Sequence, residues 1–161
     1  MVDGRLAVVA ADDAEFWLAL RREAAELSSR LLTVHSGRDC LRAIEDTRVR
    51  LVVLDSSLRD VSGTHLVHLV RRIRPDLGVI VAFDRSDMTQ EREARQAGIL
   101  YYGDRRGTRE IAAVLRKGMV VAAGDGSASA PAAGGAESAE RAPSPGSSGA
   151  PADGSTAPKH V

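Results

Sequence analysis

The stretch LVVLDSSLRDVSG, residues 51–63, decides the fold of this chain. Its first four residues are apolar and two of them are β-branched, which predicts a strand buried on both faces. Asp55 follows at the carboxyl end of this strand, and Ser62 and Gly63 then suit the first turn of a helix. In a parallel sheet, an acid at this place lies at the edge where ligands of such folds bind. An aspartate that merely ends a strand in a solvated loop gives the same pattern.

The rest of the chain up to about residue 121 alternates apolar runs with stretches of helical periodicity. The other runs of strand length cover residues 5–10, 31–35, 79–83 and 99–102. Helices are expected over residues 14–27, from about residue 38, over 62–73, over about 87–98 and over about 108–118. Five strands alternating with five helices predict an α/β fold, a doubly wound parallel sheet with helices on both faces.

The composition changes near residue 122. From there to residue 161 the chain consists almost entirely of Ala, Gly, Ser and Pro. Such a segment offers too little apolar surface to offset the entropy cost of ordering its backbone, about 1–2 kcal/mol per residue. We therefore expect one folded domain over residues 1–121 and a disordered tail over residues 122–161.

Charge, cysteine content and hydropathy exclude several classes of function. The chain has 22 basic and 22 acidic residues, so no overall positive field favours nucleic acid or an anionic membrane. Cys40 is the only cysteine, which rules out an internal disulfide and a thiolate metal cluster. No apolar run approaches the ~20 residues of a membrane helix, and the first residues do not resemble a secretion signal. These features predict a cytoplasmic protein without direct contact to nucleic acid or membrane.

Acidic residues follow two of the predicted strands. Asp12 and Asp13 come after the first strand, and Asp55 comes after the third. Because the carboxyl ends of parallel strands share one edge of the sheet, we expect these side chains to converge. Carboxylate oxygens suit Mg²⁺, and a carboxylate beside such a metal can attack a phosphoryl group. Acids also gather at strand ends simply because loops are solvated.

Residues 5–119 resemble the receiver domain of two-component response regulators in element order, spacing and motif. The run from Val8 to Phe16 is similar to that family's first strand and acidic turn. Further positions are similar to its phosphoacceptor strand, the following loop and the segment around its fifth strand. They are Leu54, Asp55, Leu58, Ser62, Gly63, Gly98, Tyr102 and Arg105.

The resemblance implies a flavodoxin-like (βα)5 fold with strand order 2-1-3-4-5. It implies that Asp55 is the phosphoacceptor, receiving the group from a histidine kinase or a phosphotransfer protein. Asp12 and Asp13 would hold Mg²⁺ together with Asp55 and the backbone carbonyl of Ser57. Tyr102 would report phosphorylation to a downstream protein through the face of the fourth helix, fifth strand and fifth helix, and the resemblance also allows a homodimer.

The sequence departs from the family pattern at the site itself. Aligning Glu15 and Phe16 places Ala11 where the family has the first of two adjacent acids, which weakens the expected Mg²⁺ site. Phe83 replaces the usual hydroxyl residue and cannot donate to a phosphoryl oxygen, a loss of roughly 1.5–3 kcal/mol. Arg105 replaces the usual lysine, keeping the charge with a different geometry. The phosphoryl and switch positions Phe83, Tyr102 and Arg105 are therefore atypical.

Two functions remain open at this point. The first is an atypical, single-domain response regulator that accepts phosphate on Asp55 and signals through protein contacts. The alternative is an interaction module that has kept the fold and works without phosphorylation, a pseudo-receiver, for which Ala11 and Phe83 are the motivating residues. An enzyme with its own substrate is disfavoured, because the sequence has no glycine-rich phosphate loop and no nucleophile with an adjacent base.

Overall fold

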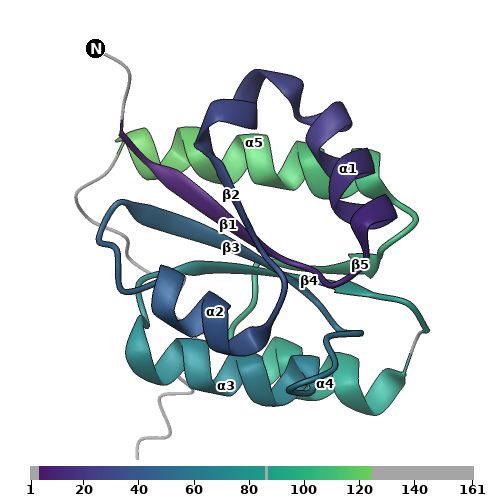
Figure 1. Ribbon diagram of the computed structural model, residues 1–161. Coiled ribbons are helices and arrows are strands. Elements are labelled where there is room, and N and C mark those ends of the chain that lie inside the picture. Colours follow the sequence, from purple (N-terminus) through teal and green to yellow (C-terminus); the bar gives the residue numbers. More distant parts are fainter. Residues whose placement is uncertain (1–3, 86, 125–161) are drawn as a thin grey trace, which may run out of the picture. The chain divides into compact units, whose positions relative to one another are not determined.

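The computed structural model describes residues 4–85 and 87–124 (Figure 1). The strands are β1 (Leu6–Ala10), β2 (Leu31–Val34), β3 (Val49–Asp55), β4 (Gly78–Phe83) and β5 (Tyr101–Asp104). The helices are α1 (Ala14–Glu23), α2 (Gly37–Ala43), α3 (Gly63–Ile73), α4 (Met88–Gln96) and α5 (Thr108–Gly124), with a 3₁₀ helix, η1, over Ala25–Arg30. All strand pairs are parallel, in the order β2-β1-β3-β4-β5. This confirms the predicted α/β fold with its doubly wound, flavodoxin-like sheet.

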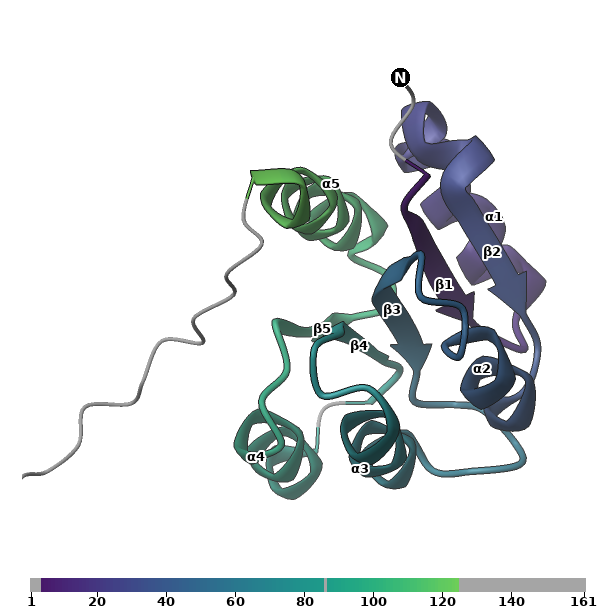
Figure 2. The ribbon, with the colours of Figure 1, turned by 90° about the vertical axis from the view of Figure 1, so that its left-hand side faces the viewer.

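The sheet separates two layers of helices. Helices α1 and α5 cover one face, and α2, α3 and α4 cover the other (Figures 1 and 2). Successive residues of β3 belong to opposite cores: Val52 and Leu54 pack with α2, α3 and α4, whereas Leu51 and Val53 pack with α1 and α5. Burial on both faces explains why this strand is an unbroken apolar run.

The predicted ends of two helices agree with the structure. Ser62 caps α3 by accepting a hydrogen bond from the His65 N–H, and Asp87 caps α4 by accepting from the Thr89 and Gln90 N–H groups. Gly98 follows α4 with a φ of 83°, the left-handed conformation that glycine adopts without strain. Local capping signals therefore set where these helices begin and end.

The helix expected over residues 14–27 is wrong in its last four residues. Helix α1 ends at Glu23, and the chain continues as η1, because Ala24 leaves helical geometry with φ −112° and ψ 43°. The chain must turn back here to begin β2 only seven residues later. The four residues predicted for the inner face are nevertheless all buried: Phe16, Leu20, Ala24 and Leu27.

The last two elements also differ from the expectation. Strand β5 begins at Tyr101, two residues later than predicted, because residues 99 and 100 connect Gly98 to the sheet; the Leu100 N–H already donates to the Val79 carbonyl at 2.7 Å. Helix α5 continues to Gly124, past the predicted helix end near residue 118. The predicted disorder of the tail, beyond Gly124, lies outside the described residues. Within the described part, no helix is both long and apolar enough to cross a membrane.

Candidate functional site

Asp55 is the last residue of β3, and its side chain is completely buried. It pairs with Ala82 of β4, and the next N–H, that of Ser56, donates to the Ala82 carbonyl at 2.8 Å. The Asp55 Oδ1 accepts from the Ser57 N–H at 3.0 Å and from the Ser57 Oγ at 2.8 Å, a local turn that aspartate favours. Its Oδ2 has no hydrogen-bond partner among the described residues. A buried carboxylate with one oxygen lacking a hydrogen bond needs a positive charge nearby.

The loop after β3 is fixed at two points. Asp60 accepts from the Gly37 and Arg38 N–H groups at 2.9 and 3.1 Å, which ties the loop to the first turn of α2. The hydrogen bond from Gly37 is the main cause that lowers the pKa of Asp60. At the other point, Gly63 packs on Ser56 so closely that an added Cβ would lie 2.9 Å from the Ser56 Cα. These contacts hold the segment next to Asp55 in one place.

The two acids after β1 have different partners. Asp13 is the N-cap of α1 and accepts from the Glu15 N–H at 2.8 Å; this bond is the first cause, with Arg105 a further one, that lowers the Asp13 pKa. Asp12 instead pairs with Arg59, with 2.8 Å between its Oδ2 and the arginine Nε. The residue before them, Ala11, is fully buried in the core, so this position adds no acid to the site.

Arg105, which follows β5, contacts both Asp13, which follows β1, and Asp55, which ends β3. One guanidinium nitrogen, Nη2, pairs with the Asp13 carboxylate and lies 3.8 Å from the Asp55 Oδ2. The other, Nη1, donates to the Ser57 Oγ at 3.2 Å. The guanidinium carbon also lies 5.6 Å from the centre of the Phe16 ring, within cation–π range. Only 14% of the Arg105 side chain is exposed, so the positive charge is held within the site.

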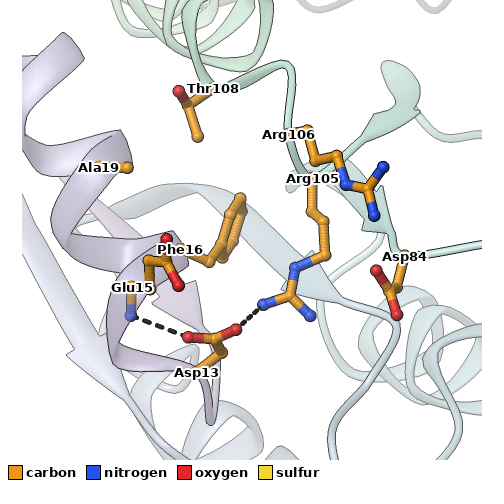
Figure 3. Close-up of a pocket in the computed structure, with 8 residues that line it drawn as sticks. All are labelled: Asp13, Glu15, Phe16, Ala19, Asp84, Arg105, Arg106 and Thr108. Atoms are coloured by element: carbon orange, nitrogen blue, oxygen red, sulfur yellow. Dashed lines mark hydrogen bonds and ion pairs between the residues drawn. The ribbon is translucent and has the colours of Figure 1, made fainter.

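A pocket of about 520 Å³ opens beside this cluster (Figure 3). Its walls come from the start of α1 and from the loops after β4 and β5, and include Asp13, Phe16, Asp84, Arg105, Arg106 and Thr108. In Figure 3, Arg105 extends toward Asp13, whereas the guanidinium of Arg106 lies on the side away from Asp13. Arg105 lines the pocket and also contacts the buried Asp55, so it lies between them. The volume is within the range of small-molecule sites.

The acids predicted to hold a metal lie next to arginines in this structure. Among the described residues, no group of three or more His, Cys, Asp or Glu side chains is placed to hold a metal ion. Asp12 pairs with Arg59, while Asp13 and Asp55 share Arg105. The positions where a hard cation would draw oxygen ligands together are thus supplied with guanidinium groups.

Phe83, at the carboxyl end of β4, stacks on Tyr102, the second residue of β5. Their ring centres are 4.7 Å apart and their planes differ by 20°. Tyr102 is 7% exposed, and its hydroxyl is buried without a hydrogen-bond partner among the described residues. Burial is the first cause that raises the pKa of Tyr102, followed by the carboxylates of Glu91 and Asp87. Tyr101, the neighbouring aromatic considered for the same role, is only half-buried and packs on the other face of the sheet.

Sequence reasoning placed Asp13, Asp55 and Arg105 at one sheet edge, where the structure joins them. It did not find the pair between Asp12 and Arg59, nor the Phe16 ring beneath Arg105. The signal for the first was present, because Arg59 lies in the loop that directly follows an acid-bearing strand. The second had no signal apart from the position of Phe16 on the inner face of a helix.

Comparison with solved structures gives many receiver domains. The BeF₃-activated receiver domain of DrrB is 25% identical with a TM-score of 0.61, over 72% of this chain and 97% of that domain. A CheY-like receiver domain protein from Methanospirillum hungatei is 16% identical with a TM-score of 0.65, over 73% of this chain and 94% of that protein. A response regulator from Burkholderia pseudomallei, with a phosphorylated aspartic acid and a calcium ion, is 19% identical with a TM-score of 0.60. The match covers 74% of this chain and 71% of that protein.

Comparisons by sequence add no relative. No protein-family model matches the chain, and no curated protein matches it. The similarity is therefore carried by the fold and by the strand order.

Proposed function

Because the folded part of this chain is a receiver domain of the response-regulator type, we propose that it acts in two-component signalling by accepting a phosphoryl group on Asp55. One observation carries the proposal: a buried carboxylate at the end of β3 with Oδ1 held by Ser57 and Oδ2 left without a hydrogen bond. The held oxygen fixes the orientation of the carboxylate. The other oxygen is the nucleophile.

The reaction needs one bond to form and one to break. The Asp55 Oδ2 forms a bond to phosphorus while the bond from phosphorus to the donor's imidazole nitrogen breaks, and that nitrogen keeps the electron pair. Positive charge near the transferring group stabilises its oxygens. Arg105 supplies this charge from 3.8 Å; because its side chain lies between Asp55 and the pocket of about 520 Å³, a donor side chain in that pocket reaches Oδ2 only when Arg105 moves aside.

The donor in this proposal is the phosphohistidine of a histidine kinase or a phosphotransfer protein. The output is a contact with a downstream protein through the face of α4, β5 and α5, to which Tyr102 belongs. We propose a cytoplasmic signalling domain and not an enzyme with its own substrate. A homodimer stays a prediction from the sequence resemblance.

Mg²⁺ also stays a prediction from that resemblance. The Burkholderia protein contains a calcium ion, but at 19% identity it supports the fold alone. In this chain the predicted ligands Asp12, Asp13 and Asp55 lie next to arginines, and the hydroxyl of Ser57, whose backbone carbonyl is the predicted ligand, is hydrogen-bonded to Asp55 and Arg105. We therefore assign no step of the transfer to a metal.

The test is incubation with phosphoramidate or acetyl phosphate, with and without MgCl₂, followed by intact-mass measurement. We expect an adduct of one phosphoryl group that hydroxylamine removes and that Asp55→Ala abolishes. Asp104→Asn is the matched control, because Asp104 is an exposed acid at the end of the neighbouring strand β5. An adduct that persists in Asp55→Ala, or no adduct under either condition, would contradict the proposal.

A second function, a pseudo-receiver that binds its partner without phosphorylation, is favoured by the Phe83–Tyr102 stack. The Phe83 ring stacks on the Tyr102 ring and holds it in one position. No hydroxyl side chain stands at the end of β4 to link phosphorylation to a movement of Tyr102. The absence of an adduct in the experiment above, together with an intact fold by circular dichroism, would favour this second function.

A further inference from the structure

We propose that Arg105 is the resident cation of the acidic site and that it competes with divalent metal for Asp13 and Asp55. The inference rests on the proposed function only in taking Asp55 as the acceptor, since it concerns the unphosphorylated domain. It predicts that Arg105 offsets part of the negative charge of the resting site and that a metal must displace it to bind.

Charge is the first reason. Asp55 is completely buried, and its Oδ2 has no hydrogen-bond partner among the described residues. An anion in such a place is retained only when an opposite charge lies close to it. The Arg105 Nη2 at 3.8 Å is that charge, and it also pairs with Asp13, so one guanidinium is shared by two carboxylates and offsets one of their two negative charges.

Geometry is the second reason. Nη1 of Arg105 donates to the Ser57 Oγ at 3.2 Å, so the planar fork contacts three residues that the sequence predicts as ligands. The Phe16 ring supports the guanidinium at 5.6 Å. A lysine ammonium is a single point charge and cannot span these partners in the same way. The fork therefore makes the arginine a strong competitor for the carboxylate oxygens of Asp13 and Asp55 that a metal needs.

A second arginine acts at the outer acid. Arg59 pairs with Asp12 at 2.8 Å, although 90% of the Arg59 side chain is exposed. An exposed pair of this kind is weak and is screened by salt. Arg59 is therefore easily displaced, and Arg105 is the residue on which the competition depends.

The experiment measures Mg²⁺ binding directly, by calorimetry and by the emission of Trp17, the only tryptophan of the chain, which follows Phe16. We expect Arg105→Met to bind Mg²⁺ about tenfold more tightly than the wild type, because the competing cation is gone. Arg106→Met is the matched control: it removes the adjacent positive charge, whose side chain points away from Asp13, and we expect it to bind Mg²⁺ as the wild type does.

Equal affinity of the wild type and Arg105→Met would overturn the inference, and so would the absence of Mg²⁺ binding in both. Circular dichroism checks the fold of each variant. If Arg105→Met does not fold, Arg105→Lys carries the test, with tighter Mg²⁺ binding than the wild type expected. These outcomes are independent of phosphorylation: a failed adduct with a gain of affinity in Arg105→Met would remove only the proposed function, and the reverse result only this inference.

Discussion

Tyr102 keeps its ring in the core while its hydroxyl is buried without a partner among the described residues. A buried hydroxyl without a hydrogen bond costs about 1–3 kcal/mol. We therefore expect Tyr102→Phe to leave the free energy of unfolding unchanged or to raise it by up to about 1 kcal/mol, because the stack with Phe83 is retained. Urea unfolding followed by circular dichroism measures the change.

Tyr101→Phe is the control for this prediction, because Tyr101 is half-buried on the opposite face of the sheet and its change should have a smaller effect. A loss of stability in Tyr102→Phe well above that of Tyr101→Phe would mean that the hydroxyl makes a stabilising bond. The hydroxyl of Tyr102 would then contact a polar group that this structure does not place beside it.

The positions of Asp55 and Arg105 in the fold could be predicted from the sequence, but the contacts of Arg105 could not. Asp55 and Arg105 follow their strands directly, so the topology of a parallel sheet brings them to one edge whatever their side chains do. The contacts of Arg105 could not be predicted in the same way. Its long side chain has many rotamers, and the choice of Asp13 and Ser57 as partners depends on the tertiary positions of two other loops.

At the scale of elements, Asp60 links the loop after β3 to the start of α2. Its carboxylate accepts the Gly37 and Arg38 N–H groups, and the hydrogen bonds lower its pKa, the Gly37 bond first. Because the folded state favours the ionised form, this contribution is present above the unfolded pKa of ~3.9 and is lost as the pH falls through the lower folded pKa. We expect Asp60→Asn to lower the free energy of unfolding by about 1 kcal/mol at neutral pH.

The difference between wild type and Asp60→Asn should shrink as the pH falls below about 4. Urea unfolding at neutral pH and at acidic pH measures this difference. Asp84→Asn, an exposed acid in the loop after β4, is the control and should change stability little at either pH. A difference between wild type and Asp60→Asn that stays constant down to acid pH would contradict the role of the carboxylate charge.

Element boundaries set a further limit on prediction. Helix α3 and helix α4 begin where capping side chains predict, because Ser62 and Asp87 act within a few residues of themselves. The end of α1 and the start of β5 carry no such local signal. Ala24 leaves helical geometry so that the chain can turn toward β2, and β5 begins where the ladder Ile80–Tyr101 becomes possible. Both boundaries are decided by contacts distant in the sequence.

At the scale of the folded domain, the sheet is shared by two cores. Leu66 of α3 is fully buried in the core that also contains Val52 and Leu54, and Leu115 of α5 is fully buried in the core that contains Leu51 and Val53. The two cores therefore meet along β3 from Leu51 to Leu54. Loss of packing on one face should weaken the strand that supports the other face, so we expect the domain to unfold in a single transition.

Leu66→Ala tests this coupling, because Trp17 lies on α1, across the sheet from Leu66. A buried Leu→Ala change costs about 2–5 kcal/mol. We expect the urea midpoint to fall equally by Trp17 fluorescence, which reports on the α1 face, and by far-ultraviolet circular dichroism, which reports on all helices. Leu115→Ala is the matched variant on the side of Trp17, and its two midpoints should also coincide. A fluorescence midpoint that stays at the wild-type value in Leu66→Ala would mean that the two faces unfold independently.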